Sequence, residues 1–213
     1  MPSLEQARAW YPEHDPVHGF DHILRVYRMA EKLAIAEGGD IEIVRAAALL
    51  HDAEGSATSG GEEGRLNHHR ISADFARQVL EAEGWPEERI AAVLHCIRAH
   101  RFRDESENPQ TLEARILFDA DKLDVIGAFG IARTIAYDVV VGQPIYSPPS
   151  DRFVRTGERE PDEPHSSYHE YLFKLSKIKD RLYTKSARKL AQERHRFLKE
   201  FFERLADEDR GLR

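Results

Sequence analysis

One stretch decides the fold of this chain, Ile41-Glu-Ile-Val-Arg-Ala-Ala-Ala-Leu-Leu-His51-Asp52. Asp40 precedes it as a predicted N-cap, and the nearly continuous apolar run is typical of a helix packed inside a protein. Apolar residues three, four and seven positions before His51 place that histidine on the buried face. A buried ionisable pair is costly unless it is compensated, and a metal ion is one compensation. From this stretch alone, the alternative is a helix C-terminus where His51 and Asp52 hydrogen-bond to backbone groups that the helix leaves unpaired.

Composition indicates an ordinary soluble globular protein. The chain has 213 residues, 41% of them hydrophobic and 32% charged, which is enough for a good core in one domain. The net charge of -7 argues against a general polyanion-binding surface, so we expect no nucleic-acid partner. Cys96 is the single cysteine and is interpreted as a core residue, which favours a reducing compartment. The sequence shows no signal segment or membrane-length apolar run, and we predict a cytoplasmic protein without a membrane partner.

The rest of the chain shows helical periodicity and no strand pattern longer than a few residues. Helices are predicted over 3–11, 21–37, 68–83, 87–100, 111–141, 168–180 and 184–207. Asn67 is the expected cap of the third of these, and Gly127 and Gly130 suggest a close helix crossing or a kink in 111–141. We predict an all-α, single-domain helical bundle, 1–213.

Residues 142–167 interrupt this helical pattern. They are rich in proline and serine, are not expected to sustain a helix, and at this length are typical of a functional or lid-like loop. The predicted core is therefore about 14–141, with C-terminal helices at 168–207 packing on it. Those last helices are compatible with a monomer or a homodimer.

Four polar positions lie on or beside the apolar faces of separate predicted helices: His22, His51, Asp52 and Asp121. Any one of them is more often a satisfied core residue than a ligand. Together on consecutive core helices they are harder to explain without an ion, because each bare group would cost stability. Two imidazoles and two carboxylates suit Mn, Mg, Fe, Co, Ni or Zn, with water completing the shell.

In this order the residues resemble the H…HD…D signature of the HD-domain metal-dependent phosphohydrolases. The likeness extends to the flanks and covers approximately 14–205, including His18-Gly-Phe-Asp-His22-Ile-Leu-Arg-Val and Ile97-Arg-Ala-His100-Arg-Phe. The resemblance implies an HD-type helical bundle that holds one divalent ion, with manganese or magnesium favoured, and acts on phosphate esters or anhydrides. The chain looks closest to small stand-alone bacterial and archaeal members, some of which are similar to nucleoside triphosphate pyrophosphohydrolases.

Attack at phosphorus also needs cations for the phosphate oxygens and a proton donor or acceptor. Lys122 and Arg70 are the first candidates for the cationic clamp, with Arg25 after them, although each is by default a solvated surface charge. Glu54, two residues past the His-Asp pair, is the first candidate for the general acid or base. Asp124 is the alternative, and its other possible role is to orient a ligand histidine.

Further histidines point toward the same interior. His68 lies on the apolar face of its helix and His69 does not, while His100 ends the following helix. By resemblance of order, His68 and His100 are candidates for a second ion bridged by Asp52, and we rank one ion ahead of two. Otherwise they donate hydrogen bonds to substrate phosphate or are packed, and His18 is a candidate to line the pocket.

The predicted function is hydrolysis of a small phosphorylated substrate by a divalent-metal-dependent phosphohydrolase. The substrate expected first is a nucleotide, with a (d)NTP cleaved to the (d)NMP and pyrophosphate. The alternatives are a 5′-nucleotidase-like phosphomonoesterase and a cyclic-nucleotide phosphodiesterase. A non-catalytic nucleotide-binding sensor is the alternative outside the enzyme class.

Overall fold

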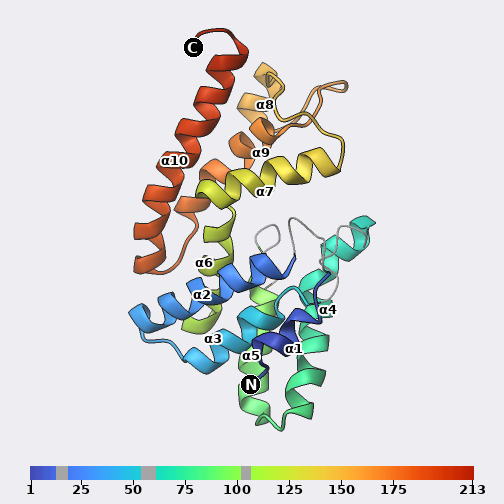
Figure 1. Ribbon diagram of the computed structural model, residues 1–213, viewed down its shortest axis with the longest axis vertical. Helices are drawn as coiled ribbons and strands as arrows, with labels where there is room; N and C mark the ends of the chain where they lie inside the picture. Colours follow the sequence, from blue (N-terminus) through green and yellow to red (C-terminus); the bar gives the residue numbers. More distant parts are fainter. Residues whose placement is uncertain (13–18, 54–60, 102–106) are drawn as a thin grey trace. The chain divides into compact units, whose positions relative to one another are not determined.

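The computed structural model describes residues 1–12, 19–53, 61–101 and 107–213, with the backbone alone for 61–67. Every regular element in these ranges is a helix, which confirms the all-α prediction (Figure 1). The elements are α1 (Leu4–Arg8), α2 (Phe20–Glu37), α3 (Ile41–Leu50), α4 (Gly61–Ala82), α5 (Glu87–Ala99), α6 (Leu112–Asp124), α7 (Gly127–Val140), α8 (Asp151–Thr156), α9 (Ser167–Phe173), the 3-10 helix η2 (Leu175–Asp180) and α10 (Lys185–Asp209). Among the described helices, none has both the length and the apolar character that a membrane span requires.

The first of two compact units comprises Met1–Asp121 and Leu182–Ala187. Helix α3 is its centre and packs against α1, α2, α4 and α5, as Figure 1 lets the reader follow. Six of the ten residues of α3 are fully buried, so the apolar run quoted above forms the core of this unit. The end of α3 therefore delivers His51 and Asp52 into the interior.

The start of α3 is set by a local cap. One carboxylate oxygen of Asp40 accepts hydrogen bonds from the amides of Glu42 and Ile43, which confirms Asp40 as the N-cap. Arg89 of α5 pairs with the same carboxylate at 2.9 Å. This ion pair ties the beginning of α3 to α5 and lowers the pKa of Asp40. The register of α3, and hence the position of the His-Asp pair at its end, is thereby fixed at both its cap and its buried face.

The second unit comprises Lys122–Arg181 and Arg188–Arg213, with α7 packed on α9. The single helix predicted over 111–141 is wrong, because the chain breaks between α6 and α7. Gly127 there has φ +77°, a conformation that side chains rarely adopt. A Cβ on Gly130 would lie 2.3 Å from the backbone of Val125, so the turn also needs a glycine at that position.

Two further local predictions are wrong. Helix α4 begins at Gly61, so Asn67 lies inside the helix and does not cap it. The segment 142–167 does sustain a helix, α8, because Ser150 caps its start and Gly157 at φ +77° ends it. The predicted boundaries of core, lid and C-terminal helices stay predictions.

Candidate metal centre

Two histidines and one aspartate, carried by α2 and the end of α3, meet in the core of the first unit. His22 comes from the first turn of α2, and His51 and Asp52 follow the last residue of α3. One ligand atom from each lies within 4.8 Å of the others, and all three side chains are buried. The Nε2 atom of His22 is also 3.4 Å from Oδ1 of Asp121 on α6. The structure thus brings together all four of the predicted metal ligands.

A second group shares Asp52 with the first. Nε2 of His68 on α4 lies 3.7 Å from Oδ1 of Asp52, and Nε2 of His100, the C-cap of α5, lies 3.5 Å from the same oxygen. The other oxygen, Oδ2, lies 3.6 Å from Nε2 of His51. Asp52 therefore stands between two sets of imidazoles, with one oxygen toward each. His68 is the most exposed member of this second group, at 19% for its side chain.

Hydrogen bonds to the backbone orient two of these rings. Nδ1 of His51 lies 2.9 Å from the carbonyl oxygen of Ala48, and Nδ1 of His100 lies 2.5 Å from that of Ile97. A carbonyl accepts only, so Nδ1 of each ring carries a proton, and in the neutral form of His51 the lone pair of Nε2 turns inward. Nε2 of His51 is buried and has no hydrogen-bond partner among the described residues. A lone pair facing a carboxylate oxygen across a buried gap fits a bound cation.

Burial sets the charge states of the centre. It lowers the pKa of His51 to about 4, although the carboxylate of Asp52 opposes the shift. Burial alone would raise the pKa of Asp52, but His51, His100 and His68 outweigh it and hold that pKa well below its ordinary range. Near neutral pH the centre then offers a neutral imidazole and an ionised carboxylate. These are the forms in which the two residue types bind divalent metals.

Tyr11 is a neighbour of this centre that the sequence analysis did not identify. Its ring packs in an apolar cluster with Ile23, Leu49 and Ala53, and its hydroxyl donates a hydrogen bond of 2.7 Å to the carbonyl oxygen of Leu49. Burial, reinforced by the charge of Asp52, raises the pKa of Tyr11 well above its ordinary value. The hydroxyl therefore stays protonated beside the carboxylate. Nothing in the local sequence pattern around Tyr11 signals this contact.

Of the remaining predicted site residues, His18 and Glu54 lie outside the described residues. Arg25 on α2 is half-buried and Arg70 on α4 is exposed. Lys122 follows Asp121 directly in the chain, is buried, and belongs to the second unit.

The structure also gives the surroundings of Asp124 and His69. Asp124, the alternative acid or base, belongs to the second unit and pairs with Arg133, with Nη1 and Oδ2 2.9 Å apart. The placement of His69 away from the interior is wrong, since His69 is 2% exposed and its ring lies 5.7 Å from that of His68. Helix α4 thus buries His69 and partly buries His68, which happens when a helix packs on more than one side.

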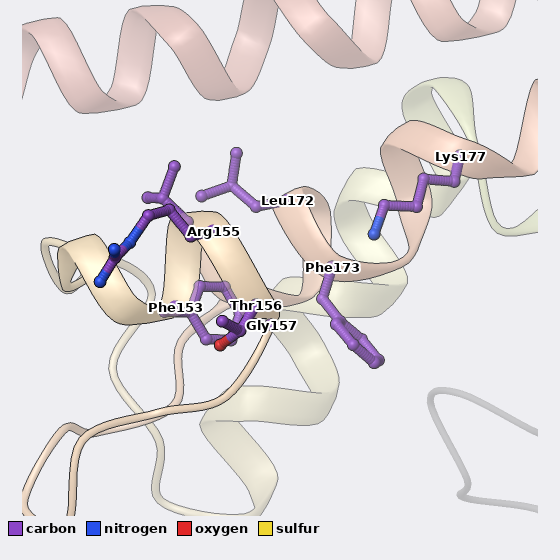
Figure 2. Close-up of a pocket in the computed structure, with 8 residues that line it drawn as sticks. Phe153, Arg155, Thr156, Gly157, Leu172, Phe173 and Lys177 are labelled. Carbon is purple, nitrogen blue, oxygen red and sulfur yellow. The ribbon is translucent and has the colours of Figure 1, made fainter.

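The described part of the chain also has a hollow within the second unit. Figure 2 shows its lining, which includes Phe153, Leu172 and Phe173 with the cations Arg155 and Lys177. None of the lining residues is a histidine, a carboxylate or a cysteine. The hollow therefore offers no general base or metal ligand, and the buried histidine centre is the candidate site.

Comparison with known protein families agrees with this geometry. The model of the HD domain matches residues 19–126. That range begins one turn before His22 and ends just after Asp121, so it contains all four predicted ligands together with His68 and His100.

Relatives match over nearly the whole chain. The uncharacterized protein YpgQ of Bacillus subtilis is 29% identical over 100% of this chain and 96% of its own length. Its crystal structure in complex with ADP superposes with a TM-score of 0.71 at 29% identity, covering 97% of each chain. A protein from Lactobacillus plantarum gives a TM-score of 0.75 at 27% identity over 98% of this chain and 95% of its own. An HD-superfamily hydrolase from Bacillus thuringiensis gives 0.62 at 33% identity over 89% and 85%.

Proposed function

Since the chain belongs to the HD-domain family, we propose that this hydrolase is a divalent-metal-dependent phosphohydrolase that cleaves a small phosphorylated substrate. The observation that carries the proposal is the buried Nε2 of His51, which faces Oδ2 of Asp52 at 3.6 Å. The ring proton of His51 is on Nδ1, where it bonds to the carbonyl of Ala48. A cation at that point would satisfy both atoms.

The proposed ligands are His22, His51, Asp52 and Asp121. The two carboxylates supply the negative charge and the imidazoles supply neutral donors, a set that suits manganese or magnesium as well as iron, cobalt, nickel and zinc. His68 and His100 on the other oxygen of Asp52 are the candidates for a second ion. We keep one ion ahead of two, with these histidines as hydrogen-bond donors to substrate phosphate.

A divalent ion bound by these residues supplies Lewis-acid polarisation of a phosphoryl oxygen and a bound water of lowered pKa. The protein contributes the buried surroundings, which strengthen each electrostatic interaction, and rings whose orientation is set before substrate arrives. Lys122 and Arg70 remain the first candidates for the clamp on phosphate, followed by Arg25. Because Asp124 is paired with Arg133, Glu54 remains the first candidate for the general acid or base.

We propose a nucleotide as the substrate, with a (d)NTP giving the (d)NMP and pyrophosphate. The support is the crystal structure of YpgQ in complex with ADP, since that protein aligns with this chain over nearly its full length. ADP contains a phosphoanhydride, the type of bond that the proposed reaction breaks. A nucleoside monophosphate and a cyclic nucleotide are the competing substrates.

A screen of metals against substrates tests the proposal. Metal-free protein is supplied with Mn, Mg, Co or Ni and incubated with a dNTP, a nucleoside monophosphate, a cyclic nucleotide and a generic phosphate ester. We expect metal-dependent release of pyrophosphate from the dNTP. Release of phosphate, or of a linear monophosphate, from the other substrates would replace this assignment, and turnover without added metal would contradict the mechanism.

The second candidate is a nucleotide sensor, which the crystal structure of YpgQ in complex with ADP also supports, because a sensor would bind a nucleotide as well. A sensor would show a raised Tm with nucleotide and would return the nucleotide intact with every metal in the screen. Recovery of pyrophosphate in the same samples would exclude it.

A further inference from the structure

The last turn of α3 departs from regular helix geometry where it reaches the metal centre. In a regular α-helix the carbonyl of Leu49 accepts from the amide of Ala53. Here the amide of Ala53 donates instead to the carbonyl of Leu50, at 3.3 Å. The chain thus tightens immediately after Leu50, in the turn that carries Asp52.

Side chains donate hydrogen bonds to the backbone carbonyls at the end of α3. The hydroxyl of Tyr11 donates to the carbonyl oxygen of Leu49 at 2.7 Å, and it lies close enough to Asp52 for that carboxylate to help raise the pKa of the tyrosine. One residue earlier, the carbonyl of Ala48 accepts from Nδ1 of the His51 ring at 2.9 Å. The tyrosine therefore holds the backbone carbonyl two residues before His51, while the carbonyl of Ala48 holds the His51 ring.

We propose that Tyr11 is a positioning residue of the metal centre. Its hydroxyl replaces the missing helical amide at the end of α3 and holds Asp52 in the orientation in which the carboxylate faces His51, His68 and His100. The inference rests on the proposed function insofar as that orientation serves to bind a metal ion. It extends the centre to α1 and the residues after it, which lie outside the range matched by the HD-domain model.

The packing around Tyr11 makes a clean substitution available. The ring is 6% exposed and lies against Ala7, Ile23, Leu49 and Ala53, so Tyr11→Phe keeps the apolar contacts and removes only the hydroxyl. Tyr27 of α2 lies against the same cluster and is only partly buried. Tyr27→Phe is thus a matched control, with the same chemical change in the same cluster.

The first measurement is manganese binding to the metal-free protein by calorimetry. Removing an outer partner of a metal ligand typically weakens metal binding by about 10–100-fold, and we expect a rise of Kd in this range for Tyr11→Phe. Tyr27→Phe should bind with the wild-type Kd, and the far-UV circular dichroism of both variants should match the wild type. A wild-type Kd in Tyr11→Phe would overturn the inference while leaving the proposed function intact.

The second measurement needs no metal. Amide hydrogen exchange of Asp52 and Ala53 is compared by NMR in the metal-free wild type and Tyr11→Phe, and we expect faster exchange in the variant. If the wild type bound no divalent ion, the proposed function would fail and exchange would still decide whether Tyr11 holds this turn. Unchanged exchange at both amides would overturn the inference.

Discussion

Two buried clusters of this protein combine histidine with carboxylate, and their polar atoms are satisfied in opposite ways. In the second unit, Glu163 accepts hydrogen bonds from the amide and hydroxyl of Ser150 at 2.7 and 2.6 Å, from the amide of Glu160 at 2.7 Å and from His169 at 3.0 Å. The other ring nitrogen of His169 is 2.7 Å from the hydroxyl of Ser166. Every polar atom of this Glu163 cluster named here has a partner at ordinary hydrogen-bond distance.

In the metal centre, by contrast, ring nitrogens and carboxylate oxygens face one another at 3.4 to 3.7 Å. The Nδ1 protons of His51 and His100 are directed toward backbone carbonyls. The comparison teaches that residue types alone do not distinguish the clusters. Donors matched to acceptors make a structural network, whereas a buried imidazole lone pair that faces a carboxylate oxygen, as at His51, is the arrangement in which we propose a cation.

The largest expected effect separates the two carboxylates. Asp52→Asn should lower hydrolysis at least about a thousandfold, because several kcal/mol of transition-state stabilisation disappear with the metal. Glu163→Gln should keep the wild-type kcat/KM, since Glu163 touches only structural partners. The measurement is kcat/KM on the substrate found in the screen. Equal losses in the two variants would remove the distinction drawn between the clusters.

Metal content sharpens the description of the centre itself. We expect one equivalent of metal in protein purified without chelator, retained in His68→Ala and lost in His22→Ala, because His22 belongs to the four-ligand group. Elemental analysis of the three proteins is the measurement. Two equivalents in the wild type that fall to one in His68→Ala would instead establish a second ion on Asp52, His68 and His100.

The smallest effect concerns the pH dependence of stability in the Glu163 cluster. Partial burial works against the charge of Glu163, but its hydrogen bonds from Ser150, His169 and Glu160 outweigh this and lower its pKa to about 2 from the ordinary 4.5. A lowered folded-state pKa contributes stability above pH 4.5 that is lost as the pH falls toward 2.

Glu163→Gln should therefore have a Tm about 2–4 °C below that of the wild type at neutral pH. This difference in Tm should narrow as the pH drops below 4.5, the ordinary pKa of a glutamate carboxyl group. Thermal unfolding followed by circular dichroism over a series of buffers measures the gap. A gap that does not change with pH would mean that the charge of Glu163 contributes nothing to stability. A matched series on Asp151→Asn, an exposed carboxylate on α8, serves as the control.

Much of the site was predictable from local pattern. The apolar phase of α3 placed His51 inside, and the phases of α2 and α6 did the same for His22 and Asp121. These predictions depend on a periodicity of 3.6 residues, which is a property of each helix by itself. The break between α6 and α7 was foreshadowed by Gly127, yet its extent depended on the approach of Gly130 to Val125.

The tertiary structure decided the contacts that join distant segments. That the hydroxyl of Tyr11 would meet the end of α3, 38 residues along the chain, depends on how α1 packs, and no local pattern encodes it. The same holds for the burial of His69 and His169, which sit in polar surroundings in the sequence. Helix periodicity determines which way a side chain points, so the sequence by itself yielded the helices and their ligand residues. Which atoms then meet is set by long-range packing, and this alone separated a converging set of acceptors from a satisfied network.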